Sequence, residues 1–499
     1  MLSALSGFGP RLPASRASSA GELARRAEQA LRSAGYPLAR VVAVGDGAAV
    51  GEASGKVHLR VFLGDVSGLD VHNSSRVSTQ LLERMLSSAL CPEAGPGHGC
   101  VLQSHRLERA TVLVSSLPGV KAMSLGVSGD PHRPGAVRLH ADVTGTDHAV
   151  QAALSLDNGG LPSTGRGRLG ISLSAPSVIR AGDSVSIQLA DSQKNELTGL
   201  LDWNQPLGSR GLRLDTQYSR TTYSLPLGGS ASVTGSAQTV SAGLSYPLAL
   251  NFDRVMNVQA DVGEVRSRAQ VSQLGTFQDR KIPYVDLALS GNSGLRSVAG
   301  GMNYSLWSAA LTYGHPTDGA PLAAAQDGVG AQVLQPFTRL SMQYAIRREF
   351  GDSPWSAGLN LRGQMASRNL DPSEALSIGG PGGVRGYPVD EGSLDEGVLA
   401  TADVSRSYRT RRGALVVPDL FVDYANGRVH HSTWSGWNAG DPSLTNHRTL
   451  AAYGVALDVQ YRSAQFSVSV ARPLPSSPSS IANPSGPATQ VWGALTWHF

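Results

Sequence analysis

Few side chains in this sequence have the types and spacing needed for chemistry. Its two cysteines, Cys91 and Cys100, bracket a short segment rich in Gly and Pro. Because no second cysteine pair could complete a zinc site and no Cys-x-x-Cys motif is present, a disulfide is favoured over metal or redox chemistry. His430 and His431 have no third ligand in the pattern, which favours surface histidines over a metal centre. No nucleophile, base and acid stand in a recognisable arrangement, so we expect neither an enzyme, nor a metal site, nor a cofactor.

A glycine-rich run at 377–387, with the letters SIGGPGGVRGY, is another candidate for a functional segment. Glycine-rich loops can cradle phosphate, but no Gly-Lys-Ser/Thr follows here and no strand–helix–strand unit surrounds the run. An ordinary flexible loop is the simplest alternative. A separate basic group fits either contact with an incoming chain or, more commonly, a solvated turn. It consists of Arg406, Arg409, Arg411 and Arg412.

Composition narrows the class of protein. Gly accounts for 58 of the 499 residues, about 12% against about 7% in average proteins. Hydrophobic residues make up 41%, which is too many for a disordered chain. No run of about 18 apolar residues is present, which excludes a helical membrane protein. The net charge of +4 is too small over this length to argue for a nucleic-acid partner.

The first part of the sequence mixes helical and strand-like patterns. Helical spacing over 20–34 and alternation over 41–44 and 56–63 predict the later half of an α+β unit. Residues 66–144 predict the complete α+β unit, in the order one strand, two helices and two more strands. These are expected at 68–71, 78–90, 104–117, 120–127 and 136–143. Residues 1–19 lack the basic and apolar regions of a secretory signal, so we expect a disordered segment or a misassigned start.

From residue 146 to 499 the pattern changes to long two-residue alternation. Apolar residues alternate with polar ones over 212–219, 339–347 and 453–462. Strands of about nine residues or more match the span of a tilted membrane strand, whereas soluble strands average about five or six. Charges recur on the polar face, as expected of a water-filled lumen. We therefore expect a transmembrane β-barrel over 146–499.

The spacing of the strands predicts the topology of this barrel. Strands are expected at 398–408, 414–426, 451–461, 465–472 and 491–499. Long connections at 371–397, 428–449 and 475–487 alternate with short turns at 409–413 and 462–464. Such alternation is typical of outer-membrane barrels, which have short periplasmic turns and long outer loops. At about 22 residues for each strand and its loop, the region gives roughly 16 antiparallel strands, and the fold class is mainly β.

Several of these motifs resemble one family of outer-membrane proteins. The segment Val384-Arg385-Gly386-Tyr387 is similar to the VRGY/F loop of the haemolysin secretion/activation family (ShlB/FhaC/HecB), the transporters of two-partner secretion. The run 156–166 resembles the first barrel hairpin of that family, and 107–120 resembles the second helix and exit turn of its POTRA domain. The C-terminal residues Trp497 and Phe499 are similar to its aromatic barrel-assembly signal.

The resemblance also implies a partner for the loop arginine. In the family this arginine reaches a carboxylate on the inner barrel wall, in a motif close to Phe-x-Asp-x-Gly. Phe421 and Asp423 match that motif here, with Ala425 in place of Gly. Alternation over 416–424 independently places Phe421 and Asp423 on the lumen face. We expect Arg385 to pair with Asp423, because a buried charge without a partner is strongly destabilising, and we expect the loop 371–397 to fold inward.

The function that the resemblance implies is transport of protein. An outer-membrane pore would recognise an unfolded exoprotein through periplasmic POTRA domains, a partial one at 20–64 and a second at 66–144. It would move this haemolysin- or adhesin-like partner, which carries an N-terminal secretion domain, to the cell surface. The lipid bilayer and the barrel-assembly machinery would be further partners. Two alternatives stay open, a POTRA–barrel factor that inserts outer-membrane proteins and a passive solute porin. Because the family normally carries a leader, we expect a late start codon or a truncated gene.

Overall fold

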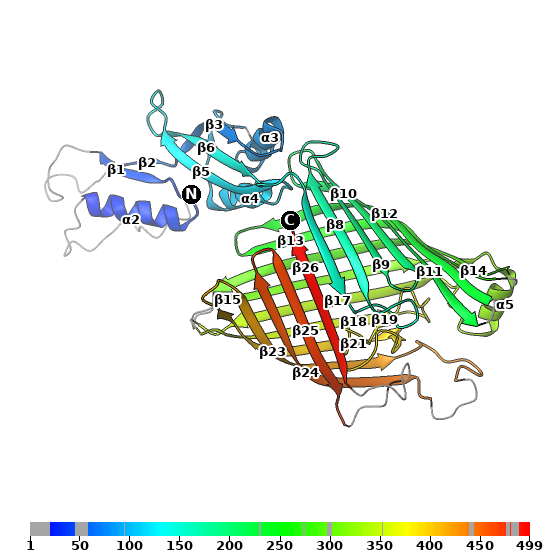
Figure 1. The fold of residues 1–499 in the computed structure, drawn as a ribbon. Coiled ribbons are helices and arrows are strands. Elements are labelled where there is room, and N and C mark those ends of the chain that lie inside the picture. The colour runs from blue at the N-terminus through cyan, green and yellow to red at the C-terminus, as the bar shows by residue number, and fades with distance from the viewer. Residues whose placement is uncertain are drawn as a thin grey trace.

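The computed structural model describes residues 20–44, 58–93, 95–228, 231–272, 275–296, 302–351, 353–438, 444–475, 480 and 489–499. They form two small α+β units followed by a β-barrel (Figure 1). The α+β units lie at one end of the barrel, here called the near end, and the opposite end is called the far end. The expectation for segment 1–19 falls outside the described residues.

The first unit is a helix packed on a two-stranded sheet. Helix α2 (Ala20–Ser33) covers β1 (Arg40–Val44) and β2 (His58–Phe62), and Leu31 of the helix is fully buried against them. The helix ends before Gly35, whose φ of 94° is a left-handed conformation that favours glycine. The helix and both strands lie close to the expected positions.

The second unit is a four-stranded sheet with two helices. Its elements are β3 (Asp65–Asn73), α3 (Thr79–Leu90), β4 (Cys100–Val101), α4 (Ser104–Ser115), β5 (Val120–Gly129) and β6 (Ala136–Gly145). The strand order is β4-β3-β6-β5, with β3 and β6 parallel and β5 antiparallel to β6. Leu82 and Leu86 of α3 and Val114 of α4 are fully buried with Leu139 of β6. An apolar core therefore holds this unit together.

The remaining chain forms a closed antiparallel barrel with 16 long strands among the described residues, which confirms the expected fold class. They are β7 (Gln151–Asp157), β8 (Arg168–Pro176), β9 (Ser184–Ser192), β10 (Glu196–Leu207), β11 (Leu212–Gly228), β12 (Ala231–Leu250), β13 (Arg254–Val271), β14 (Gly275–Arg296), β15 (Met302–Gly314), β17 (Phe337–Glu349), β18 (Trp355–Ala366), β21 (Glu396–Arg406), β23 (Leu415–Arg428), β24 (His447–Tyr461), β25 (Ala464–Pro473) and β26 (Gln490–His498). Two-residue pieces, β16 (Thr317–Asp318) and β22 (Tyr408–Arg409), extend the sheet.

The two faces of the barrel wall differ in polarity, as alternation requires. Leu420, Val455 and Leu495 are exposed on the outer face, where lipid would cover them. The inner face carries polar groups such as Gln217 and Asp261, which line a shared cavity. An apolar outer surface around a polar interior is the arrangement of a membrane-spanning barrel. None of the described helices has the length and apolar character needed to cross a bilayer.

The second unit is packed against the near end of the barrel. Leu250, at the end of β12, belongs to the same buried cluster as the core of the unit. Ser88 of α3 donates a hydrogen bond of 2.9 Å to the backbone carbonyl of Ser209, in the turn after β10. Arg109 of α4 similarly donates to the carbonyl of Arg210, at 3.2 Å. This unit therefore has a defined position at the near end.

Several local features differ from the sequence expectations. The short strand β4 between the two helices of the second unit was not expected. Strand β21 begins at Glu396, inside the segment 371–397 that we expected to be loop, and the loop also contains the short pair β19 (Leu376–Ser377) and β20 (Ser393–Leu394). Helix α5 (Pro321–Val329) in the far-end connection after β15 was not expected. It has no buried residue, so no apolar stripe marks it in the sequence.

Candidate functional site

The connection between β18 and β21 leaves the wall at the far end and folds back into the lumen. Four of its apolar residues are at most 1% exposed, namely Ile378, Val384, Tyr387 and Leu394. They pack on residues of β21, β23 and β24 that face inward, which are Leu399, Ala425, Leu450 and Ala452. The loop therefore has an apolar core of its own, formed jointly with one sector of the barrel wall.

Gly386 explains why this loop needs glycine beside the wall. A Cβ atom at Gly386 would lie 2.7 Å from Cβ of Ala452 and 2.9 Å from the backbone nitrogen of Pro473. Contacts this short are not tolerated, so any side chain would push the loop away from β24 and β25. Glycine at this position allows the close approach that buries Tyr387 and Val384.

Arg385 and Asp423 are brought together on the lumen side of β23. The guanidinium donates two hydrogen bonds of 2.8 Å, one from Nε to Oδ2 and one from Nη2 to Oδ1. The backbone N–H of Arg385 and the hydroxyl of Thr401 also donate to the carboxylate, at 3.0 and 2.9 Å. The Asp423 side chain is 1% exposed and that of Arg385 16%. A paired, hydrogen-bonded carboxylate of this kind is a strong anchor.

Phe421 lies beside this ion pair. The guanidinium carbon of Arg385 is 3.2 Å from the centroid of the Phe421 ring, so the cation lies over the ring face. Phe421 is 3% exposed, whereas its neighbours Leu420 and Val422 are 63% and 49% exposed on the other side of β23. The ring therefore covers one face of the guanidinium and limits the access of water to it.

Three further ion pairs attach the loop to the wall, and sequence reasoning did not single out any of them. Arg280 of β14 pairs with Asp371 and Arg448 of β24 pairs with Glu391. Arg339 of β17 pairs with Glu374 at 2.6 Å. The acidic members lie within the expected loop 371–397, but nothing in the sequence indicates which of the many arginines each one meets.

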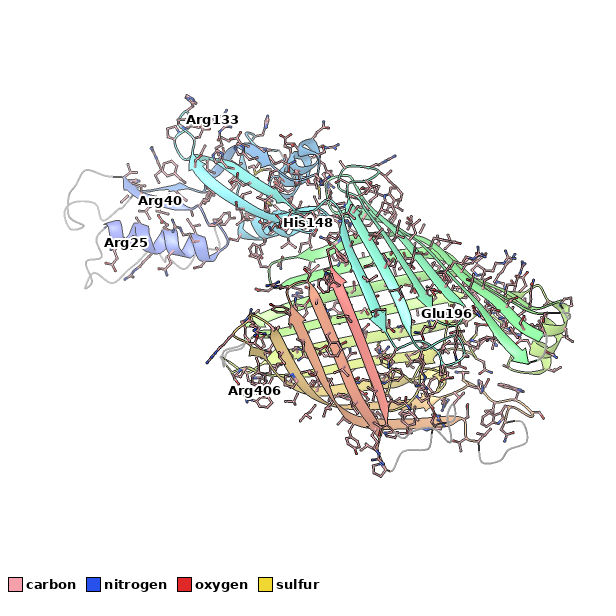
Figure 2. The ribbon with its side chains drawn as sticks, in the orientation of Figure 1. Arg25, Arg40, Arg133, His148, Glu196 and Arg406 are labelled. Atoms are coloured by element: carbon pink, nitrogen blue, oxygen red, sulfur yellow. A yellow bond between two sulfur atoms is a disulfide. The ribbon has the colours of Figure 1, made fainter. Side chains whose placement is uncertain are left out.

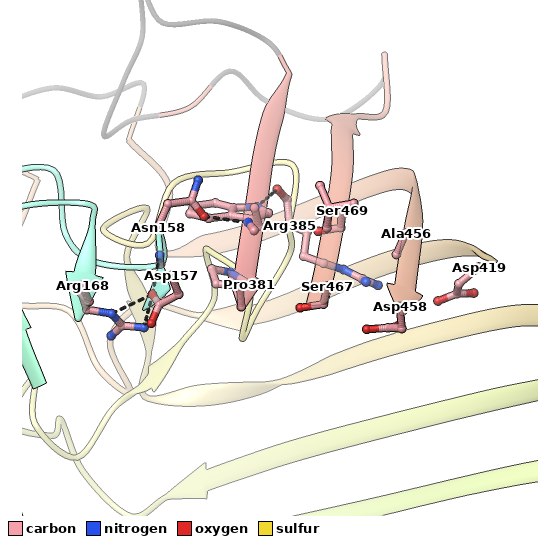
Figure 3. A pocket seen from close by; sticks show the side chains of 15 residues that line it. Asp157, Asn158, Arg168, Pro381, Arg385, Asp419, Ala456, Asp458, Ser467 and Ser469 are labelled. Carbon is pink, nitrogen blue, oxygen red and sulfur yellow. Dashed lines mark hydrogen bonds and ion pairs between the residues drawn. The ribbon is translucent and has the colours of Figure 1, made fainter. Parts of the chain in front are cut away.

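The space beside the inward loop is open to water. A cavity of about 400 Å³ is lined by Arg385 and Pro381 of the loop and by Asp419 and Asp458 of the wall (Figure 3). A second cavity of about 380 Å³ lies between the strands β11 to β17 and the inward loop, and Gln217, Ser241 and Glu374 are among the residues that line it. In the described part of the chain, no three His, Cys, Asp or Glu side chains are placed to hold a metal ion.

The outer loop after β23 also rests on the base of the inward loop. His430 and His431 are half-buried here and not simply at the surface, which corrects our expectation. The backbone N–H of His431 donates to Asp395 and its Nδ1 lies 2.9 Å from Glu396, so local tertiary contacts bury the pair. Asp395 is 2% exposed, and burial raises its pKa to about 6, opposed by the hydrogen bond from His431.

The cysteines and the C-terminal aromatics lie elsewhere. Cys91 and Cys100 are bonded to each other, with their Cα atoms 5.5 Å apart, and join the end of α3 to β4.

The C-terminal aromatic residues lie at the near end, where Trp497 is 50% exposed and Phe499 is 69% exposed. The backbone N–H of Phe499 donates to the carbonyl of Ala152 at 2.9 Å, which extends the pairing of β26 with β7.

The basic cluster lies at the near end, in the turn between β21 and β23. Figure 2 shows Arg406 at this end of the barrel. Its guanidinium carbon is 4.7 Å from the ring centroid of Tyr408 and 5.3 Å from that of Trp355. Arg409, Arg411 and Arg412 are exposed. The cluster is therefore distant in the fold from the loop that carries Arg385, and contributes nothing to its anchoring.

Comparison with known proteins identifies the family. The family described as "Haemolysin secretion/activation protein ShlB/FhaC/HecB" matches residues 137–445, more than half of the chain. The chain belongs to this family. It is accordingly a two-partner secretion transporter of the outer membrane, with periplasmic POTRA domains, and it translocates an exoprotein across that membrane. The near end of the barrel therefore faces the periplasm and the far end faces the outside.

Individual relatives agree with this membership. The heme/hemopexin transporter protein HuxB of Haemophilus influenzae is 23% identical over 429 residues, which cover 84% of this chain and 72% of HuxB. CdiB from Escherichia coli has a TM-score of 0.75 at 19% identity, over 95% of this chain and 84% of CdiB. BamA from Haemophilus ducreyi, in a form lacking POTRA domains 1–3, has a TM-score of 0.55 at 13% identity, over 96% and 93%. At these identities the two structures show a shared fold only.

Proposed function

We propose that the ion pair between Arg385 and Asp423 is a latch that keeps the tip of the loop on β23 while the exoprotein passes through the lumen. The observation that carries this proposal is the shared core of the loop with β21, β23 and β24. The polar cavity along β11 to β15 is bordered by Ser373 and Glu374 of the loop, so the position of the loop sets how much of this space is open. An unfolded chain moving past polar side chains meets no apolar surface that would retain it.

Substitution of Arg385 is the most direct test of the latch. Arg385→Ala removes the cation that Asp423 needs, and a buried carboxylate without its partner destabilises its surroundings by about 3–5 kcal/mol. We expect secretion of the exoprotein into the medium to fall at least tenfold, measured by quantitative immunoblot. Assembly of the barrel should persist, seen as a folded band that shifts on heating in gel electrophoresis.

A matched arginine in the same lumen serves as the control. Arg347 of β17 pairs with Asp403 at 2.9 Å, both on the barrel wall. Arg347→Ala removes the same charge and a more exposed ion pair, with side chains 48% and 14% exposed, without touching the loop, and secretion should stay close to normal. Normal secretion by the Arg385→Ala variant, or an equal loss in both variants, would contradict the latch.

The second POTRA unit offers an edge for the partner. Strand β5 pairs with β6 on one side, and among the described residues no strand pairs with its other edge. An extended, haemolysin- or adhesin-like exoprotein with an N-terminal secretion domain would add a strand there. A photoreactive residue in place of Val127, which is 44% exposed on β5, should crosslink to the partner. The same residue in place of Glu83, exposed on α3, should not, and equal crosslinking at both positions would contradict the edge proposal.

The exposed C-terminal aromatics would serve assembly. Trp497 and Phe499 end the strand that closes the barrel and remain accessible at the near end. Replacement of Phe499 by Ser should therefore reduce the amount of folded barrel recognised by the assembly machinery, without changing how much exoprotein each assembled molecule secretes. A loss of secretion per assembled barrel would argue against a role confined to assembly.

A further inference from the structure

The tip of the inward loop is held on two strands of the barrel. Arg385 pairs through its side chain with Asp423 of β23, and its backbone carbonyl accepts a hydrogen bond of 2.8 Å from Nε1 of Trp492. Trp492 lies on β26 and is 6% exposed. The indole N–H is a donor only, and a buried one needs an acceptor. The loop supplies that acceptor, so the last strand of the barrel has a direct bond to the loop tip.

The same strand is one half of the pair that closes the barrel. β26 and β7 share five residue pairs, from Ala494–Asp157 to His498–Ala153, whereas β25 and β26 share eight. The closing pair is therefore shorter than the pair beside it. In a barrel, fewer paired residues mean fewer backbone hydrogen bonds to hold the two strands together.

Asn158 compensates for this short pairing. Beyond Asp157 regular pairing stops, but the backbone N–H of Asn158 donates to the carbonyl of Gly493 at 3.2 Å. The side-chain amide donates to the carbonyl of Val491 at 2.9 Å and accepts from the N–H of Gly493 at 2.8 Å. These three bonds grip β26 on both sides of Trp492. Figure 3 shows Asn158 and Arg385 on the same cavity, close to β26.

We propose that Asn158 and Trp492 form a clasp that couples the position of the inward loop to the pairing of β26 with β7. Asn158 fixes the backbone around Trp492, Trp492 fixes the carbonyl of Arg385, and both act as positioning residues. Coupling between two sites is reciprocal, so release of the loop weakens the closing pair and loosening of that pair frees the loop. The inference deepens the proposed function, because its meaning for transport rests on the latch.

If the clasp exists, a substitution at Asn158 must change the position of the loop tip, although Asn158 itself bonds to β26. The side chain of Asn158 makes its hydrogen bonds to β26 and none to the loop among the described residues, so Asn158→Ala removes bonds that hold β26 and leaves the hydrogen bonds of the loop itself in place. Trp492→Phe keeps the aromatic ring but removes the N–H that Arg385 needs. Because phenylalanine is smaller than tryptophan, Trp492→Phe also removes some packing, and Asn158→Ala, which leaves the Trp492 ring intact, separates the hydrogen-bond chain from packing at this site.

Loop release is measured on the purified protein, in the absence of exoprotein, so the result is independent of whether the latch serves secretion. Val384→Cys is the common background, since this side chain is fully buried and reacts with a maleimide only when the loop leaves the wall. Trp492→Phe and Asn158→Ala should each speed labelling about fivefold, the effect expected from loss of one net hydrogen bond. Amide exchange over 490–498 should rise in both.

Trp307→Phe is the matched control. Trp307 of β15 lies directly opposite the exposed Tyr344, and no hydrogen bond of its indole is present within the described residues. It should label at the wild-type rate. Wild-type labelling in Asn158→Ala, or equal acceleration in Trp307→Phe, would overturn the clasp. If Asn158→Ala does not give a heat-shifted folded band, Asn158→Ser, which is too short to keep both side-chain bonds to β26 and adds no charge, takes its place with the same two outcomes.

Discussion

The second POTRA unit and the inward loop each have a buried apolar core, but the two cores are secured in different ways. The POTRA core is almost entirely hydrophobic and contains both cysteines of the disulfide. The loop core is much smaller, and ion pairs from Asp371, Glu374, Arg385 and Glu391 surround it and join it to the wall. Apolar burial gives the first region stability of its own. The second depends on charges, which a single substitution can unbalance.

Asp423→Asn should produce the largest difference between the stability of the inward loop and that of the second POTRA unit. The amide keeps the shape of the carboxylate but leaves the Arg385 cation without a counter-charge, which destabilises the bound loop by about 4 kcal/mol. Limited proteolysis should then cut within 371–397, while peptides from the POTRA units keep their wild-type hydrogen exchange. Protection of the loop at the wild-type level would show that its apolar core holds it unaided.

The converse substitution is Leu86→Ala, in the POTRA core. Leu86 is fully buried between α3 and the sheet, and shortening it leaves a cavity that costs about 3 kcal/mol. Hydrogen exchange over 79–145 should accelerate, and the loop should stay protected, because none of the described residues that form this core or pack against it belongs to the loop. Faster exchange in both regions would show that they unfold together and would remove the distinction.

Removal of the disulfide should have the next largest effect on the POTRA unit. The bond between Cys91 and Cys100 closes a loop with a sequence separation of 9, and constraint of a loop of that size in the unfolded chain is worth about 2–3 kcal/mol. Cys91→Ser with Cys100→Ser should lower the thermal stability of the unit and leave latch-dependent labelling of the loop unchanged. An unchanged melting transition would show that the hydrophobic core alone determines the stability of the unit.

How far the sequence foretold these regions depends on the range of the interactions. Alternation in strands such as β24 and helical spacing in α3 are local signals, and both elements lie within a few residues of the expected positions. The charge pairs of Asp371 and Glu374 and the bond between Trp492 and Arg385 join residues far apart in the chain. Nothing in the pattern around each residue specifies its distant partner, so only the family motif pointed to Asp423.

The same reasoning explains the histidines at the outer loop. His430 and His431 read as surface residues because they stand in a polar, Trp- and Ser-containing stretch. Their burial arises where that stretch crosses Asp395 and Glu396 at the base of β21. Contacts between two loops depend on the path of each loop, which local propensity does not determine.

The smallest predicted effect concerns pH and tests whether Asp395 adds to the charge dependence of the loop. Its folded-state pKa, raised by burial to about 6, exceeds the unfolded value near 3.9, so the folded state binds more protons between these values. Stability of the loop base should therefore fall as pH rises through this window, by about 1 kcal/mol between pH 5 and pH 7. Hydrogen exchange over 393–431, corrected for the intrinsic rate, should show this trend in the wild type. Asp395→Asn, beside the unchanged His431 and Glu396, should flatten it, and an equal slope in the variant would assign the trend to those neighbours.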